Sequence, residues 1–162
     1  MMLPIELKLL LLILIANGVP VIATAIFGQW GAHPLDSGRR FGDGQRLWGD
    51  SKTWRGLLLA LLVTGLVALA LGLPALIGVI IGAAAMAGDL LSSFIKRRLG
   101  MASSSMALGL DQIPESLLPL LAVAGEFGLS WPTMILMTLG FMALELALSQ
   151  VLFRLGVRNR PY

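Results

Sequence analysis

The first group of side chains that could carry chemistry lies in one polar stretch, residues 33–56. It holds eight charged residues of both signs and five Gly. Gly-rich turns bring backbone N–H groups close to a ligand, and beside Arg and Lys they suit a polyphosphate, whereas carboxylates suit Mg²⁺. A solvated loop whose charges only fix membrane topology explains the same residues equally well. The charged set comprises Asp36, Arg39, Arg40, Asp43, Arg46, Asp50, Lys52 and Arg55.

A second group surrounds Asp89 in the segment GDLLSSFIKRRLG. On a helix, Ser92, Ser93 and Lys96 follow Asp89 by three, four and seven residues and share its face. A carboxylate in an apolar membrane helix costs roughly 2.5–3.5 kcal/mol at mid-bilayer and indicates a functional site. The alternative is a contact from Asp89 to Lys96 or Arg97 that only neutralises the charge.

The third group is Asp111, Gln112 and Glu115. Asp111 and Glu115 are four residues apart, so they share a helix face and repel each other unless a cation lies beside them. A helix N-cap at Asp111, with Glu115 favoured by the helix dipole, is the alternative interpretation.

Carboxylates, a basic Gly-rich loop and serines together fit phosphoryl or nucleotidyl transfer. In such reactions Mg²⁺ held by Asp bridges a triphosphate, while Arg and Lys neutralise the leaving pyrophosphate. The chain has no Cys, which excludes thiolate nucleophiles and Cys-ligated metals. A lipid phosphate could itself be the attacking group, so no protein nucleophile is required.

The elements that must position these groups are membrane helices. Of the 162 residues, 57% are apolar and only 13% are charged, whereas soluble domains carry about 25% charge. The mean hydropathy is +0.86. Because a spanning helix needs roughly 20 apolar residues, we predict an all-α integral membrane protein with one domain, residues 1–162. The predicted spans are residues 5–30, 57–73, 75–95, 113–124 and 131–155.

The distribution of basic residues predicts the topology. Eleven of the twelve Lys and Arg residues follow the first, third or fifth predicted span, and such residues collect in cytoplasmic loops. We therefore expect five transmembrane helices, an N-terminus outside, a cytoplasmic C-terminus and a polar cytoplasmic loop between the first two helices. Topology accounts for the net charge of +3, so no nucleic-acid partner is expected. The three basic groups are Arg39 to Arg55, Lys96 to Arg98, and Arg154, Arg158 and Arg160.

The polar motifs resemble those of the CDP-archaeol synthase family, membrane cytidylyltransferases related to phosphatidate cytidylyltransferase. The patterns are DGxRxxGDxKTxRG and GDLxxSFxKRRLG, followed by Asp111 and Gln112. The residues that carry the resemblance are Pro34, Asp36, Gly38, Asp43, Gly44, Arg46, Gly49, Asp50, Lys52, Thr53, Arg55, Gly56, Gly88, Asp89, Ser93, Phe94, Lys96, Arg97, Arg98, Gly100, Asp111 and Gln112.

The resemblance implies transfer of CMP from CTP to the phosphate of an isoprenoid ether-linked glycerol phosphate or a similar lipid, with Mg²⁺ and release of pyrophosphate. It implies a multi-pass cell-membrane enzyme with a cytoplasmic active site. By position it makes Asp89, Asp111 and Lys96 catalytic and Asp89 and Asp111 metal ligands. The nucleotide-binding set comprises Asp43, Arg46, Asp50, Lys52, Thr53, Arg55, Ser93 and Arg97.

The chain departs from the family pattern after Gln112. Family members read DQLD, whereas this chain continues with Ile113, Pro114 and Glu115, so we assign Glu115 as the replacement metal ligand. Two alternatives stay open: an enzyme resembling CDP-alcohol phosphotransferases, and a small transporter or scaffold. The Gly78 and Gly82 pair allows close helix approach within the chain or in a homodimer. Glu145, inside the last span, pairs with a basic group or faces a polar neighbour.

Overall fold

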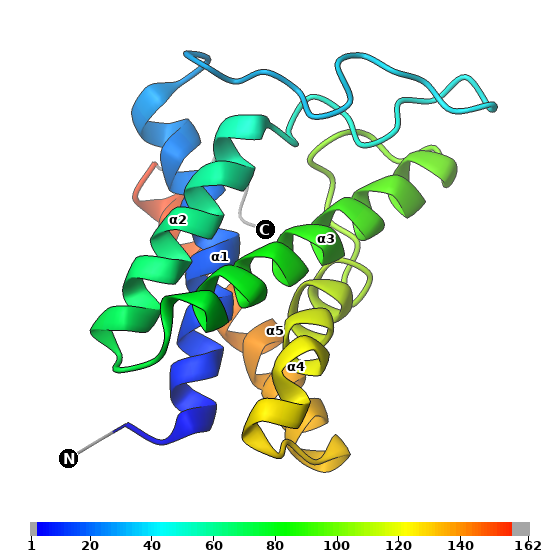
Figure 1. Ribbon diagram of the computed structural model, residues 1–162. Helices are drawn as coiled ribbons and strands as arrows, with labels where there is room; N and C mark the ends of the chain where they lie inside the picture. Colours follow the sequence, from blue (N-terminus) through cyan, green and yellow to red (C-terminus); the bar gives the residue numbers. More distant parts are fainter. Residues whose placement is uncertain (1–2, 157–162) are drawn as a thin grey trace.

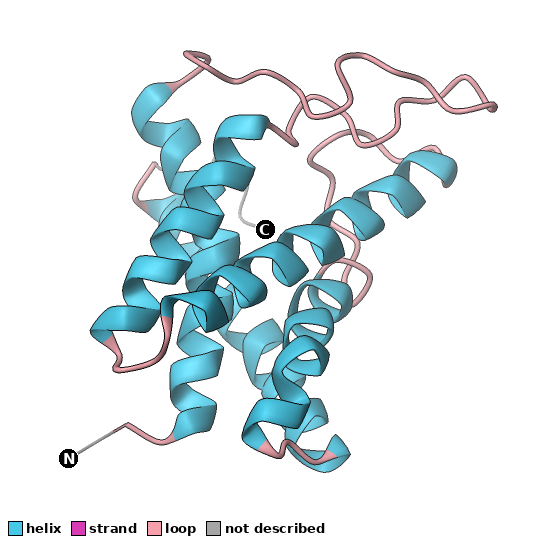
Figure 2. Cartoon of the chain, in the orientation of Figure 1, coloured by secondary structure: helices cyan, strands magenta, loops and turns pink. Residues whose placement is uncertain are grey.

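A computed structural model describes residues 3–156, which form five helices joined by loops (Figure 2). Arg158 and Arg160, part of the third basic group, lie outside the described residues. Within residues 3–156 there is no strand, only two isolated antiparallel bridges, Pro34 with Thr53 and Arg40 with Arg46. The all-helical prediction is confirmed. The helices are α1 (Ile5–Phe27), α2 (Trp54–Ala70), α3 (Ala75–Arg98), α4 (Gln112–Phe127) and α5 (Trp131–Arg154).

Each predicted span corresponds to a helix, and local signals explain the shifted ends. Helix α2 begins three residues early because the Thr53 side chain caps it, accepting a hydrogen bond from the Gly56 N–H at 3.1 Å. Helix α1 ends before Gly28, whose φ of 53° breaks the helix. Helix α4 is only 16 residues long and ends at Gly128, in the left-handed conformation common at helix C-termini.

Three helices, α1, α3 and α5, are long and apolar enough to cross a membrane by length and composition, and α2 is a shorter apolar helix. Figure 1 shows the α1–α2 loop and the C-terminal end of α3 at one end of the bundle. The α2–α3 and α4–α5 turns lie at the other end, with the start of α1. The first two basic groups of the sequence therefore lie at the same end of the molecule.

Small residues allow α2 and α3 to pack closely. A Cβ added at Gly78 would lie 2.7 Å from the Ala68 Cβ and 2.8 Å from the Gly65 Cα, both on α2. At Gly82 the nearest atoms, 3.4 Å away, also belong to α2. The small-residue pair of α3 therefore packs inside the bundle, which answers the question that its sequence left open.

The apolar core is built mainly from α1, α3, α4 and α5. Fully buried side chains such as Leu9, Ile81, Leu120 and Phe141 meet there. Helix α5 contacts α1 and α4 but neither α2 nor α3 within the described residues. Helix α3, in contrast, contacts α1, α2 and α4. Helix α5 is therefore separated from α2 and α3, and the polar side chains described next lie between them.

Candidate active site

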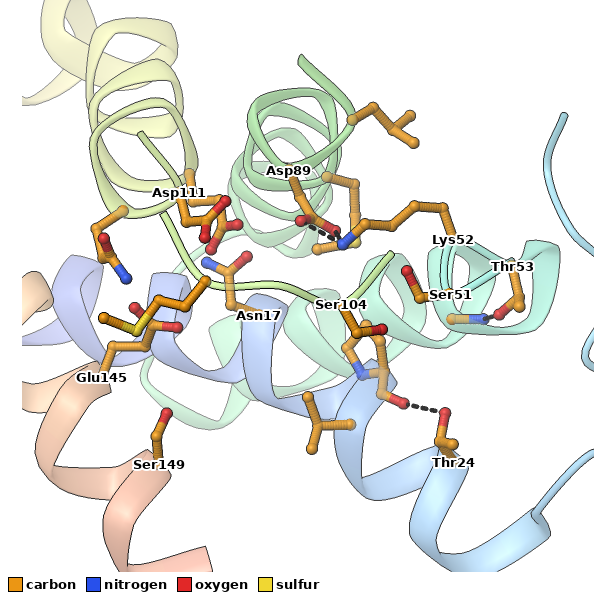
Figure 3. A pocket seen from close by; sticks show the side chains of 18 of the residues that line it. Asn17, Thr24, Ser51, Lys52, Thr53, Asp89, Ser104, Asp111, Glu145 and Ser149 are labelled. Carbon is orange, nitrogen blue, oxygen red and sulfur yellow. Dashed lines mark hydrogen bonds and ion pairs between the residues drawn. The ribbon is translucent and has the colours of Figure 1, made fainter. Parts of the chain in front are cut away.

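A cavity of about 650 Å³ lies between the helices and is lined by residues of all five. Figure 3 shows polar side chains directed into it from α1, α3, α5 and the two long loops, the α1–α2 loop (residues 28–53) and the α3–α4 loop (residues 99–111). Apolar side chains, among them Val21, Leu57 and Leu146, line the same space. A charged and an apolar ligand could therefore meet inside one cavity. Its ionisable lining residues are Lys52, Asp89, Lys96, Asp111, Glu115 and Glu145.

Asp89 is paired with Lys52 from the first loop. The Lys52 Nζ lies 2.5 Å and 2.6 Å from the two carboxylate oxygens of Asp89 (Figure 3). Burial opposes the charge of Lys52, but the negative charges of Asp89, Glu115 and Asp111 outweigh it and raise the pKa of Lys52. The neutralising contact considered for Asp89 thus exists, with Lys52 as its partner in place of Lys96 or Arg97.

Asp111 and Lys96 form a second pair, with the Lys96 Nζ 2.6 Å from the Asp111 Oδ1. The other Asp111 oxygen accepts a hydrogen bond from the Ala107 N–H at 2.8 Å, and Lys96 also donates to the Ser105 carbonyl. Asp111 occupies the N-cap position of α4, but its side chain makes no capping hydrogen bond. The N-cap interpretation therefore does not account for this side chain.

Glu115 is buried at the start of α4, within hydrogen-bonding reach of Asp89. Glu145 of α5 lies close enough for its charge to act on Glu115. Carboxylates this close repel one another unless a cation or a proton lies between them. The cavity therefore gathers four carboxylates and two lysines, an arrangement that favours binding a cation together with an anion.

Asp36 lies at the centre of the loop that carries Lys52, although it is not among the predicted site residues. Its carboxylate is buried and accepts hydrogen bonds from the Arg46 guanidinium and from the N–H groups of Gly38, Trp48 and Gly49. Burial by itself would raise the pKa of Asp36, but these hydrogen bonds outweigh it and hold the pKa well below its ordinary value.

Asp36→Asn is expected to lower the free energy of unfolding by about 1–3 kcal/mol at neutral pH, because buried donors lose a charged acceptor. A depressed folded-state pKa stabilises the fold above the ordinary value and is lost as the carboxylate is protonated. The gap between wild type and variant should therefore shrink below pH 3.8, the ordinary value. Denaturation of both proteins in detergent across this range measures it; a gap independent of pH would contradict the assignment.

The α1–α2 loop is held mainly against the C-terminal end of α3 and also touches the α3–α4 loop. Arg98 lies 2.5 Å from the Asp43 carboxylate, donates to the Arg46 carbonyl at 2.7 Å and packs over the rings of Phe41 and Phe94. Ser51 and Ser103 approach to 3.4 Å. This contact network holds the first loop against the end of α3.

The structure brings together some of the predicted site residues and leaves others apart. Those that line the cavity are Lys52, Thr53, Asp89, Lys96, Asp111 and Glu115. Asp43 pairs with Arg98, while Arg46 and Asp50 pair with each other at 2.7 Å. Ser93 is buried on α3 outside the cavity lining. The remaining two, Arg55 and Arg97, donate to backbone carbonyls: Arg55 to Trp30 and Gly28, Arg97 to Ala102.

Sequence reasoning missed several cavity residues, chiefly Asn17, Ser104 and the inward position of Glu145. Asn17 donates to the Ile13 carbonyl at 3.0 Å. Ser104 has a φ of 59°, unusual for a residue other than Gly. Asn17 and Glu145 could have been found as polar side chains inside apolar membrane helices. No feature of the sequence pointed to Ser104.

The carboxylates fit Mg²⁺ by chemistry, since its ligands are oxygens and one or two carboxylates suffice when phosphates supply the rest. Within residues 3–156, no group of three or more His, Cys, Asp or Glu side chains is arranged to hold a metal. Asp89 and Glu115, which lie close together in space, supply the one or two carboxylates that Mg²⁺ needs when phosphates provide the other ligands.

A helical bundle whose cavity is lined by carboxylates and lysines has the fold of an intramembrane enzyme. A solved structure described as an intramembrane enzyme for archaeal membrane lipids biosynthesis shares this fold, with a TM-score of 0.72 and 36% identity. The match covers 87% of this chain and 90% of that one.

The particular family follows from the sequence comparisons. The family described as CarS-like, CDP-archaeol synthase, matches residues 2–162. CDP-archaeol synthase of Methanosphaerula palustris is 34% identical over 89% of this chain and 97% of its own. That of Aeropyrum pernix is 35% identical over 95% and 89%. The chain belongs to the CDP-archaeol synthase family, which confirms the resemblance of its motifs.

Proposed function

We propose that the protein transfers CMP from CTP to the phosphate of an archaeol-type lipid, forming a CDP-lipid and pyrophosphate. One observation carries this proposal: charged and apolar side chains line the same cavity between the helices. A triphosphate suits the wall that carries Lys52 and Lys96, and a lipid suits the wall that carries Val21 and Leu146. Family membership supports this reaction over a CDP-alcohol phosphotransferase or a transporter.

The reaction needs no protein nucleophile. An oxygen of the lipid phosphate attacks the α-phosphorus of CTP, a new P–O bond forms, and the bond to the β-phosphate oxygen breaks to release pyrophosphate. Lys52 and Lys96 neutralise charge on the triphosphate and on the leaving group. Asp89 and Glu115, together with Asp111, would hold Mg²⁺, which would supply further charge neutralisation. Asp43, Arg46, Asp50, Arg55, Ser93 and Arg97 lie outside the cavity, so their nucleotide-binding roles stay predictions.

The five-span topology belongs to the same proposal. With α2 and α4 also crossing, the two long loops share the cytoplasmic face, where CTP is available, as the basic groups indicate. Helix α4 is short for a crossing, which a locally thinned bilayer accommodates.

A panel of lipid phosphates tests the function. Protein purified in detergent should release pyrophosphate and form a CDP-lipid only when CTP, Mg²⁺ and a lipid phosphate are all present. We expect the isoprenoid ether acceptor to react fastest, with an acyl ester acceptor as the comparison. No product with any acceptor would contradict the proposed function, and faster turnover of the acyl ester would reassign the acceptor.

A further inference from the structure

Lys52 takes the position in which a cation would neutralise the acidic pair. Its ammonium contacts both oxygens of Asp89, at 2.5 Å and 2.6 Å, and the neighbouring Glu115 and Asp111 also act on its charge. Lys96, in contrast, pairs with Asp111. Lys52 is thus the lysine that contacts Asp89, one of the two carboxylates assigned to the metal.

The backbone of Lys52 is held by its neighbours, and its four-carbon side chain carries the charge to Asp89. The Lys52 carbonyl accepts a hydrogen bond from the Leu35 N–H at 2.8 Å, and the next residue, Thr53, caps α2. The four-carbon stem between backbone and ammonium allows the charge to exchange partners while the loop stays in place. The Lys52 ammonium can therefore change partners without movement of the loop backbone.

We propose that Lys52 is a resident counter-ion that excludes free Mg²⁺ from Asp89 and Glu115 until the nucleotide arrives. This inference rests on the proposed function and concerns the order of binding. A divalent ion without nucleotide must displace the lysine and leave its charge buried and unpaired, which is costly. A triphosphate offers Lys52 new anionic partners, so metal and CTP enter the cavity together.

The consequence is a site selective for the metal–nucleotide complex. Without Lys52, Asp89 would lose its cationic partner beside Glu115, and free metal would be drawn to the two carboxylates. With Lys52 in place, Asp89 and Glu115 keep their positions but bind no metal until the nucleotide arrives.

Binding of Mn²⁺ to the full chain in detergent, without nucleotide and followed by the electron paramagnetic resonance of free Mn²⁺, tests the inference. Lys52→Met should bind Mn²⁺ at least about tenfold more tightly than wild type, because a unit positive charge in contact with the site is removed. Lys52→Arg retains the charge and should behave as wild type. Lys8→Met is the matched control, since the Lys8 Nζ donates to the Leu71 carbonyl outside the cavity lining.

Equal Mn²⁺ affinity in wild type and Lys52→Met would overturn the inference. If Lys52→Met does not fold, Lys52→Gln takes its place with the same expected gain in Mn²⁺ affinity, and no gain overturns the inference. Product formation by wild type is scored separately. Equal affinities with normal CDP-lipid synthesis refute only the counter-ion role, whereas absence of CDP-lipid synthesis refutes the proposed function.

Discussion

Asp89→Asn is expected to lower the rate of CDP-lipid formation by at least about 100- to 1000-fold, the usual cost of removing a group that organises transition-state charge. Asp89 is the partner of Lys52 and the neighbour of Glu115, so it connects the groups proposed to hold metal and triphosphate. Asparagine has nearly the same shape but no charge. The loss should therefore appear in turnover with saturating CTP and Mg²⁺, measured as pyrophosphate release.

Two measurements separate this chemical loss from unfolding. The melting temperature of Asp89→Asn in detergent should fall, because Lys52 loses its ion-pair partner, so turnover is compared at a temperature well below both melting temperatures. Glu126→Gln is the matched control, since Glu126 is an exposed carboxylate on α4 outside the cavity lining. Wild-type turnover in Asp89→Asn would move the proposed metal site to other residues.

The sequence predicted the helices and the three polar groups because both depend on local signals. Long apolar runs fix the spans, and a carboxylate such as Asp89 is conspicuous in a segment where charge is rare. The three groups converge on one cavity through Lys52, Asp89, Asp111 and Glu115, as their shared position at one end of the predicted bundle suggested.

The ion pairs inside the site could not be predicted from sequence spacing within one element. Lys52 and Asp89 are 37 residues apart in the chain, and their contact depends on how the first loop folds back over α3. That fold depends on Asp36, whose buried carboxylate gathers donors from a turn formed ten or more residues later. Spacing within one helix, the rule that suggested Lys96 as the partner of Asp89, carries no information on such loop contacts.

Gly88→Ala should separate the two carboxylates of the site without altering either. Gly88 lies where α3 crosses the start of α4, and an added Cβ would be 2.7 Å from the Glu115 backbone nitrogen and closer still to the Pro114 carbonyl oxygen. Backbone atoms yield only if α4 moves as a whole. Overpacking of this kind costs roughly 1–3 kcal/mol and occasionally more, so we expect a lower melting temperature.

The same displacement should remove activity, because Asp89 follows Gly88 directly and Glu115 follows Pro114. Moving α4 away from α3 lengthens the distance between the two carboxylates, and a misplacement of about 1 Å can cost 100-fold in rate. Gly125→Ala on α4 is the control, since no atom lies within 4 Å of its added Cβ. Paired melting and CDP-lipid assays distinguish the variants; wild-type stability and turnover in Gly88→Ala would show that close contact between α3 and α4 is not what holds Asp89 beside Glu115.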